Sequence, residues 1–286
     1  DRHVTDDYLQ ALADHIKESG HLAPEHLVDT VYFGGGTPSF FGAENLEKIL
    51  DEVQRRFRLD PDPEITLEAN PDSVNKKALK KLLRAGFNRI SVGVQSDDDE
   101  MLKKLGRPHT FEQARQAVLS AREAGFTNVS VDLMYGLPNQ TLTAWRETVE
   151  NVLSLKPDHL SAYALRVEEG TPLWNYRDCA NLPDDDRQAD MYLAACNILR
   201  DYGYEHYEIS NFARPGYASR HNLKYWSMEE YAGFGPGAHS DFGAVRYGYV
   251  RDLDGYIAGR LVLSESEGES TLARDYEYVM LSLRTA

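Results

Sequence analysis

The sequence is poor in cysteine and in basic residues, and it has no long apolar run. Its 286 residues include only two cysteines, Cys179 and Cys196, too few for a disulfide framework or a four-thiolate metal site. Acidic residues number 46 and basic residues 31, so the formal net charge is −15. That balance excludes a nucleic-acid partner bound through a broad phosphate-neutralising surface. Without a run of about 18 apolar residues or a basic-then-apolar leader, we expect a cytoplasmic protein.

What remains is an alternation of short β-rich runs with amphipathic helical stretches. Strands are expected at 30–33, 64–68, 89–95, 128–134 and 159–165, with an edge strand at 204–209. Helices are expected at 43–56, 75–84, 98–104, 111–124, 142–155, 186–201 and 276–285. Repeated βα units predict a parallel sheet, open or closed as a barrel. The pattern changes after residue 170, which predicts one domain over 1–170 and a second over 171–286.

The predicted strands end in residues that suit a small polar ligand, since ligands of parallel βα folds bind at those ends. The first strand is followed by Gly34, Gly35, Gly36 and Thr37, whose exposed backbone lets a ligand approach closely. The next three strands end near Glu68, Gln95 and Asp132. This set suits an ammonium group and hydroxyls, with Arg107 near for a carboxylate. The alternative is that each polar residue only caps a helix or turn.

Motifs extend this pattern along nearly the whole chain. They are V-Y-F-G-G-G-T-P-S at 31–39, L-E-A-N-P at 67–71, S-V-G-V-Q-S at 91–96, L-G-R-P-H at 105–109 and V-D-L-M-Y-G-L-P at 131–138. Together they resemble the radical S-adenosylmethionine (SAM) proteins of the oxygen-independent coproporphyrinogen oxidase family. Y-E-I-S-N-F-A at 207–213, H-N-L-K-Y-W at 221–226 and G-P-G-A-H-S at 235–240 are similar to a haem-chaperone branch of that family.

The resemblance implies an α/β fold, a partial (β/α)6 barrel that holds SAM and a [4Fe–4S] cluster. It also implies a role for each residue at the strand ends. The glycines would meet the amino group of the methionine part of SAM: Gly34, Gly35 and Gly36. Thr37, which follows them, would belong to the same cofactor-binding site. Glu68 would bind a polar group of SAM, and Ala164 would contact the ligand through its backbone. The same cavity would be lined by Gln95, Arg107 and Asp132.

The cluster loop is the main departure from the family pattern. These proteins hold their cluster with C-x-x-x-C-x-x-C, ahead of the glycine triplet, and this sequence has no such motif. We therefore expect the chain to lack the first barrel strand and the cluster loop, and to be a piece of a longer protein, incomplete at both ends. Cys196 is expected at an apolar position of a helix, in the hydrophobic core, and Cys179 is expected in a polar loop. Neither replaces the missing thiolates, and no metal ligand is assigned within the chain.

His221 is the predicted haem-binding residue. The segment H-N-L-K-Y-W places its imidazole beside Tyr225 and Trp226. A neutral imidazole is a common ligand of haem iron, and aromatic surface suits a porphyrin face. The alternative is a loop histidine bonded to backbone. Histidines of the polar N-terminal stretch are expected at the surface: His3, His15, His21 and His26.

Two functions remain open from the sequence. As a carrier, the protein would bind haem and hand it to acceptor proteins, with SAM and the cluster supporting that role. As an enzyme, it would cleave SAM to a radical and decarboxylate the propionates of a porphyrinogen. The haem-chaperone motifs favour the carrier, and a barrel enzyme with another small ligand is a third alternative. The partners implied are haem or a porphyrin and haem-acceptor proteins, membrane-associated ones included, with a homodimer as an allowed assembly.

Overall fold

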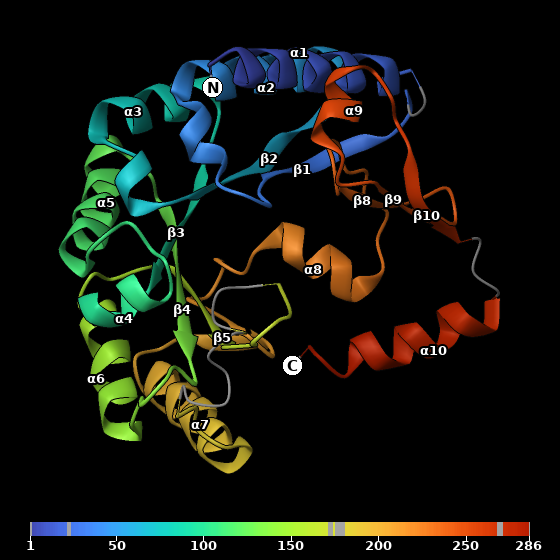
Figure 1. Ribbon diagram of the computed structural model, residues 1–286. Coiled ribbons are helices and arrows are strands. Elements are labelled where there is room, and N and C mark those ends of the chain that lie inside the picture. The colour runs from blue at the N-terminus through green and yellow to red at the C-terminus, as the bar shows by residue number, and fades with distance from the viewer. Residues whose placement is uncertain (1, 22–23, 171–173, 175–180, 268–270, 286) are drawn as a thin grey trace. The chain divides into compact units, whose positions relative to one another are not determined.

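The computed structural model describes residues 2–21, 24–170, 174, 181–267 and 271–285 of an α/β protein (Figure 1). Its helices are α1 (Arg2–Ser19), α2 (Ala43–Arg56), α3 (Lys76–Ala85), α4 (Asp99–Lys104), α5 (Phe111–Ala124), α6 (Leu142–Leu153), α7 (Asp185–Asp201), α8 (Arg220–Ser227), α9 (Leu253–Ile257) and α10 (Thr271–Ser282). Its strands are β1 (Leu27–Phe33), β2 (Arg58–Ala69), β3 (Arg89–Gln95), β4 (Asn128–Tyr135), β5 (His159–Ala164), β6 (Glu205–Glu208), β7 (Asn211–Ala213), β8 (His239–Phe242), β9 (Val245–Tyr249) and β10 (Leu263–Glu267).

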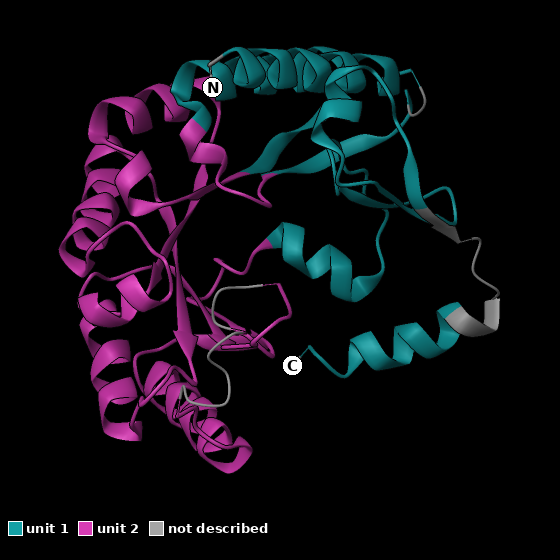
Figure 2. Cartoon of the chain, viewed as in Figure 1, with its two compact units in different colours: residues 1–32, 41–65, 220–285 teal, residues 33–40, 66–219, 286 magenta. Residues whose placement is uncertain are grey.

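The chain divides into two compact units (Figure 2). Unit 1 combines residues 1–32, 41–65 and 220–285, and unit 2 combines residues 33–40 and 66–219. Strands β1 and β2 each pass from unit 1 into unit 2 along their length. The domain boundary predicted at residue 170 stays a prediction, because the residues that follow it, 171–173, lie outside the described part.

The main sheet has seven strands in the order β1-β2-β3-β4-β5-β7-β6. Strands β2 to β5 pair in parallel, as the alternation of strands and helices predicts. Strand β7 runs antiparallel to β5, and β6 runs antiparallel to β7 at the edge of the sheet. The predicted edge strand at 204–209 is thus confirmed as β6, and β3 has the predicted bounds.

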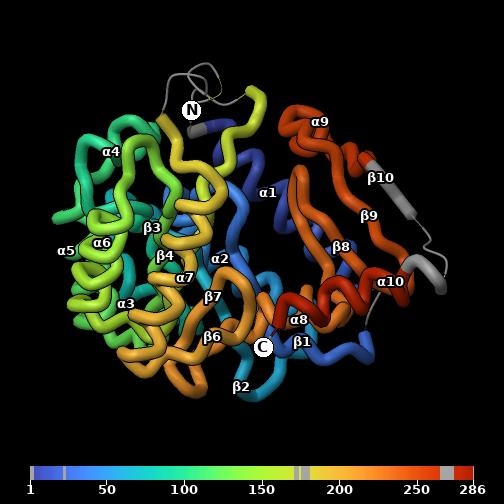
Figure 3. Tube along the Cα trace, turned by 90° about the horizontal axis from the view of Figure 1, so that it is seen from below, coloured from blue at the N-terminus to red at the C-terminus, as the bar shows by residue number. Residues whose placement is uncertain are grey.

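One face of the unit 2 strands is apolar and packs against helices α3 to α7 (Figures 1 and 3). Side chains alternate across a strand, and the residues that point to this face are fully buried: Ile90, Val92, Val94, Val129, Val131, Leu133 and Leu160. Local signals fix the helices that cover them. Helix α5 begins at a capping box formed by Thr110 and Gln113, and it ends at Gly125 in the left-handed conformation.

The other face of the same strands carries polar side chains in successive rows. Strand pairing places three of them side by side in one row: Thr66, Arg89 and Asn128. The next row toward the carboxyl ends is Glu68, Ser91, Ser130 and His159. A third row is Gly93, Asp132, Ser161 and Asn211. Because most of these side chains are nonetheless buried, they must find polar partners within the protein or in a ligand.

Unit 1 contains a second, antiparallel sheet of order β10-β9-β8, together with helices α1, α2, α8, α9 and α10. His15 of α1 ties these parts together. Its ring nitrogens lie 3.0 Å from the Tyr256 hydroxyl and 3.2 Å from the Tyr249 hydroxyl. Its side chain is only 4% exposed, so the prediction that His15 lies at the surface is wrong. The cause is that α1 turns His15 and Ile16 inward together, whereas the other N-terminal histidines are exposed as predicted: His3, His21 and His26.

The sequence interpretation also missed elements of the second half of the chain. The H-N-L-K-Y-W segment, for which no helix was predicted, lies in helix α8. The predicted helix at 276–285 begins earlier, at Thr271, and ends at Ser282. Cys196 lies in α7 as predicted but is half-buried rather than core, and burial raises the pKa of its thiol. Cys179 lies outside the described residues.

Candidate functional site

The glycine loop after β1 and the end of β2 meet through a hydrogen bond. The backbone N–H of Gly35 donates to Oε2 of Glu68 over 3.1 Å. Gly35 has a φ of 101°, a conformation that favours glycine. A Cβ built on Gly35 or Gly36 would meet no atom within 4 Å. The predicted ligand-approach loop is therefore open, and one of its N–H groups already faces a carboxylate.

Asp132 lies near this carboxylate, at the third row of the polar face. The hydroxyl of Ser91 donates to its two carboxylate oxygens, at 3.0 and 3.2 Å, and the hydroxyl of Ser161 also bonds to it. Burial, and then the charge of Glu68, raise the pKa of Asp132 to about 6, against the lowering effect of the two serines and Arg89. Two carboxylates thus share one environment, where a cation would stabilise their ionised forms.

Gln95 closes the carboxyl end of β3 in an unusual backbone conformation. Its φ is 67°, which is uncommon for a residue with a side chain, and the pairing of β3 with β4 shifts register between Gly93 and Gln95. A Cβ on Gly93 would lie 3.0 Å from Nε2 of Gln95. The bulge therefore folds the Gln95 amide back over the polar face, above the row of Ser91.

The loop that carries Arg107 lies at the same end of β3. His109 is buried, and its Nε2 lies 3.3 Å from the carbonyl of Val94. Arg107 itself is half-buried. In the part of the chain that the structure describes, its guanidinium makes no hydrogen bond or ion pair, so it is available to a ligand anion.

The last two predicted residues occupy the ends of β1 and β5. The carbonyl of Thr37 accepts from the N–H of Phe40 over 3.0 Å and so closes the turn after the glycines. Ala164 is the last residue of β5 and is paired with Tyr135 of β4. The structure thus joins Gly35, Glu68 and Asp132 by contact or charge, and places the other predicted residues at neighbouring strand ends.

His221 belongs to a separate polar cluster, within unit 1. Its Nδ1 lies 2.9 Å from the Thr30 hydroxyl, and its Nε2 lies 2.8 Å from the Tyr225 hydroxyl. The ring stacks on Tyr32, with centroids 4.8 Å apart. Both nitrogens are therefore engaged, and an iron bond through Nε2 would require the Tyr225 hydroxyl to move aside.

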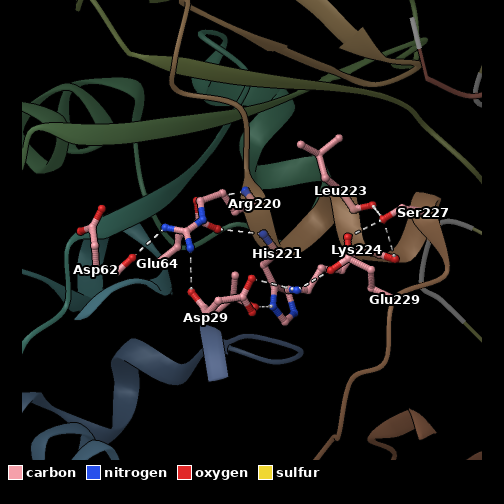
Figure 4. Close-up of polar contacts among 10 residues, drawn as sticks. Asp29, Asp62, Glu64, Arg220, His221, Leu223, Lys224, Ser227 and Glu229 are labelled. Atoms are coloured by element: carbon pink, nitrogen blue, oxygen red, sulfur yellow. Dashed lines mark hydrogen bonds and ion pairs between the residues drawn. The ribbon is translucent and has the colours of Figure 1, made fainter. Parts of the chain in front are cut away.

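The start of α8 is held by charged groups from β1 and β2 (Figure 4). The Glu64 carboxylate accepts from the N–H groups of Arg220, at 3.1 Å, and His221, at 3.0 Å. Such an anion satisfies free N–H groups and favours the positive end of the helix. The Arg220 guanidinium donates to the carbonyls of Asp62, at 2.8 Å, and Asp29, at 3.3 Å. Lys224 lies 2.9 Å from the Asp29 carboxylate.

The residues of this chain do not fit an iron–sulfur cluster. The 286 residues include two cysteines, and among the described residues no group of three histidine, cysteine or acidic side chains could hold a metal ion. The strand-end residues do fit a SAM-like ligand, because two carboxylates and an open glycine backbone suit a polar cation.

Comparison with known proteins shows the family to which this fold belongs. The sequence pattern of the Radical SAM superfamily matches residues 4–152, just over half of the chain. In structure, the chain resembles coproporphyrinogen III oxidase (HemN) from Escherichia coli, a radical SAM enzyme, with a TM-score of 0.87 and 25% sequence identity. That comparison covers 100% of this chain and 70% of the other. The chain therefore belongs to the radical SAM superfamily, and its seven-stranded sheet is the curled half-barrel of that fold.

Proteins similar in sequence show which members of the superfamily this chain resembles. The chain is 40% identical to Heme chaperone HemW of Lactococcus lactis subsp. lactis over 254 residues, 88% of this chain and 66% of that protein. It is 38% identical to Heme chaperone HemW of E. coli over 284 residues, 98% of this chain and 74% of that protein. It is a HemW-like radical SAM protein that spans about two thirds to three quarters of these relatives. Membership implies SAM and a [4Fe–4S] cluster, and likeness to HemW suggests haem. No helix in the described residues could cross a membrane.

Several residues of the two clusters were missed from sequence alone. Ser91 and Ser161 bond to Asp132. Ser91 is paired with the predicted residue Glu68, and Ser161 is paired with Asp132 itself. The alternation of polar and apolar residues along these strands could have identified both serines. Thr30 and Tyr32, which hold His221, could not have been found this way, because 191 residues separate Thr30 from His221.

Proposed function

We propose that this protein binds haem and transfers it to acceptor proteins, while the strand ends of unit 2 hold SAM. The likeness to Heme chaperone HemW carries the proposal, because it extends over 88% and 98% of the chain in the two relatives described. We further propose that the protein works in the cytoplasm, that its acceptors include membrane-associated proteins, and that the first barrel strand and the cluster loop belong to a longer form of it.

The α8 cluster supports a role for His221 in haem binding. Its imidazole is half-buried among Tyr32 and Tyr225, and aromatic side chains suit the face of a porphyrin. The ring lies within hydrogen-bond distance of a hydroxyl at each nitrogen, and these contacts orient it. If iron replaced the Tyr225 hydroxyl at Nε2 of His221, the neutral hydrogen bond between these two side chains would be lost, at a cost of about 1 kcal/mol.

A haem titration followed by the Soret band tests this role. We expect His221→Ala to reduce the Soret shift and to weaken haem binding about tenfold, the equivalent of 1.4 kcal/mol. The matched control is His21→Ala, since His21 is exposed. Melting temperature is measured in parallel. A folded His221→Ala protein with the haem spectrum and affinity of the wild type would remove this residue from the site.

The SAM site is tested at Glu68 and Gly35. Calorimetry on a form of the protein that carries the three-cysteine motif and its cluster should show weaker SAM binding for Glu68→Ala and Gly35→Val. The first loses a charged partner, worth about 1.5–3 kcal/mol. The second places a side chain in the open space of the loop and strains a backbone with φ of 101°. Unchanged affinity in both variants would return these residues to turn and capping roles.

A second candidate is coproporphyrinogen III dehydrogenase activity. It is favoured by the TM-score of 0.87 against the E. coli oxidase and by the paired carboxylates. An anaerobic assay of the cluster-loaded form, with SAM, reductant and coproporphyrinogen, decides between the two. We expect no decarboxylated product. Its appearance, at a rate that depends on Glu68, would assign the enzyme function instead.

A further inference from the structure

Tyr163 of β5 is an exposed aromatic residue on the polar face of unit 2. It lies two residues after Ser161, which is paired with Asp132 of β4. Because side chains alternate along a strand, Tyr163 and Ser161 point to the same face, about 6.6 Å apart along it. Tyr163 is therefore one step nearer the carboxyl ends of the strands than Asp132. It is 41% exposed, whereas Ser161 is 3% exposed, so the strand-end site is open at this step.

The Tyr163 hydroxyl reaches back to the row of Asp132. It interacts with the side chains of Ser161 and Asn211, and the charges of Asp132 and Glu208 act on it. Asn211 of β7 is paired with Ser161, so the side chains of Tyr163, Ser161 and Asn211 meet where β5 adjoins β7. Burial, and then the charge of Asp132, raise the pKa of the Tyr163 hydroxyl to about 12. It therefore keeps its proton and remains a hydrogen-bond donor at neutral pH.

Asn211 is fixed from its far side by Glu208. The side-chain nitrogen of Asn211 donates to Oε1 of Glu208, and the same oxygen accepts from the backbone N–H of Ser210 over 2.9 Å. Because an ionised carboxylate only accepts hydrogen bonds, this contact settles the orientation of the Asn211 amide. Asn211 is 3% exposed and Glu208 is 1% exposed. Strands β6 and β7 thus give Tyr163 a rigid support, which a side chain that positions others requires.

Ser161 links this support to the carboxylate of the strand-end site. Its hydroxyl bonds to Asp132, so its single proton is given to the carboxylate and its oxygen is left to accept from the Tyr163 hydroxyl. Hydrogen bonds in such a chain strengthen one another, and a firmer donor favours the ionised form of Asp132. The other charged groups that act on Asp132 are Glu68 of β2 and Arg89 of β3.

We propose that Tyr163 is a further residue of the strand-end ligand site: its hydroxyl positions Asp132 through Ser161, and its exposed ring contacts the bound ligand. The inference rests on the proposed function, in which that ligand is SAM. An aromatic face beside a carboxylate suits a ligand with a positive charge, and SAM has such a charge on its sulfur. Tyr163 thus joins the two carboxylates and the glycine loop as a fourth element of the site.

Footprinting with hydroxyl radicals tests the contact between the Tyr163 ring and the ligand. Peptide mass spectrometry follows the oxidation of Tyr163 in the cluster-loaded form, with and without SAM. We expect SAM to protect Tyr163, while Tyr202, 57% exposed at the end of α7, is oxidised equally in both samples. Calorimetry should show SAM binding about tenfold weaker in Tyr163→Leu, which loses the ring. The matched control, Tyr202→Leu, should bind SAM as the wild type does.

Carbon-13 NMR of labelled aspartate in the 286-residue chain tests the positioning role, and Asp132→Asn identifies the Asp132 signal. We expect Tyr163→Phe, which keeps the ring, and Ser161→Ala each to raise the titration midpoint of Asp132. In the double variant, loss of the Tyr163 hydroxyl should add nothing to the loss of Ser161, because the first acts through the second. The matched control, Tyr202→Phe, should leave the midpoint where it is in the wild type.

The outcomes separate the inference from the proposed function. A protein that binds SAM but leaves Tyr163 unprotected, or that binds SAM equally well as Tyr163→Leu, would overturn the contact while the SAM site itself stands. An unchanged midpoint in Tyr163→Phe, or additive shifts in the double variant, would overturn the positioning role. A cluster-loaded form that does not bind SAM would contradict the proposed function, and the NMR titration alone would then decide the positioning role. If Ser161→Ala does not fold, the comparison of Tyr163→Phe with Tyr202→Phe decides it.

Discussion

Two glutamates lie four residues apart on strand β2 and serve opposite purposes. Glu64 is 6% exposed, and each of its oxygens accepts a backbone N–H from the start of α8. Glu68 is half-buried and accepts from Gly35, in an exposed loop with open space around it. The same side chain thus completes a helix in unit 1 and faces a ligand loop in unit 2, and only the surroundings distinguish the two roles.

The wider clusters around these glutamates differ in the same way. Around α8, the imidazole, the guanidinium and the carboxylate each have partners within unit 1. On the polar face of unit 2, one carboxylate has a pKa raised to about 6, and the buried guanidinium of Arg89 lacks an anion in the part of unit 2 described. Buried polar groups that the protein leaves unsatisfied are costly, so the unit 2 face is the better candidate for binding a polar ligand.

The largest effect expected from this comparison is at Glu64. Glu64→Ala removes two charge-assisted hydrogen bonds and leaves two N–H groups at the start of α8 unsatisfied. We expect the free energy of unfolding to fall by about 3–4 kcal/mol. Glu68→Ala, the matched variant on the same strand, should cost about 1 kcal/mol or less. Urea denaturation of both variants measures the difference, and equal losses would contradict the division of roles.

His15 of unit 1 should make the folded protein less stable at acidic pH. Burial lowers the pKa of His15 from 6.5 to about 4. Because the folded state disfavours the charged ring, this contribution to stability is present above pH 6.5 and is lost as the pH falls toward 4. The shift corresponds to about 3 kcal/mol. We expect His15→Gln to remove this loss, so that wild type and variant converge between pH 7 and pH 4 in chemical denaturation. Parallel curves would show that His15 does not titrate in this window.

Asp132 of unit 2 should have the opposite effect on stability, because its ionisation destabilises the folded protein as the pH rises. Its pKa is raised from 3.8 to about 6, so ionisation penalises the folded state above pH 6, and the penalty is relieved as the pH falls toward 4. After allowance for its partial exposure, the effect is about 2 kcal/mol. Relative to the wild type, Asp132→Asn should gain about this much stability between pH 4 and pH 8. A constant difference across this range would mean that Asp132 has an ordinary pKa.

The fold of unit 2 was readable from sequence because its signals are local. Helix α5 has its capping residues and its terminal glycine within its own segment, and β3 alternates polar and apolar residues along its length. Helix α8 has no comparable signal. The carboxylate that holds its start is 156 residues away in sequence from Arg220, and so no helix was predicted there.

The residues of the candidate site also fall into those that local sequence predicts and those that depend on distant contacts. Its residues at strand ends could be predicted because parallel strands bring their carboxyl ends together. The pairing of Asp132 with Ser91 and the row of Thr66, Arg89 and Asn128 depend on strand register, which sequence alone does not give. His15 was misplaced because a histidine among polar residues carries no sign of the two tyrosines, more than 230 residues away, that enclose it.

The smallest expected effect sharpens the role of His221. Tyr225→Phe removes the hydroxyl that lies 2.8 Å from Nε2 of His221 but keeps the ring that packs on Tyr231. The lost hydrogen bond should lower the free energy of unfolding by about 1 kcal/mol. If His221 binds iron through Nε2, the same variant no longer has to break that bond, and its haem affinity should rise about fivefold. If His221 only holds α8 against Thr30, haem affinity should be unchanged. Because stability falls while affinity rises, a general loosening of unit 1 cannot imitate the result, and weaker haem binding in Tyr225→Phe would instead make the tyrosine hydroxyl itself part of the site.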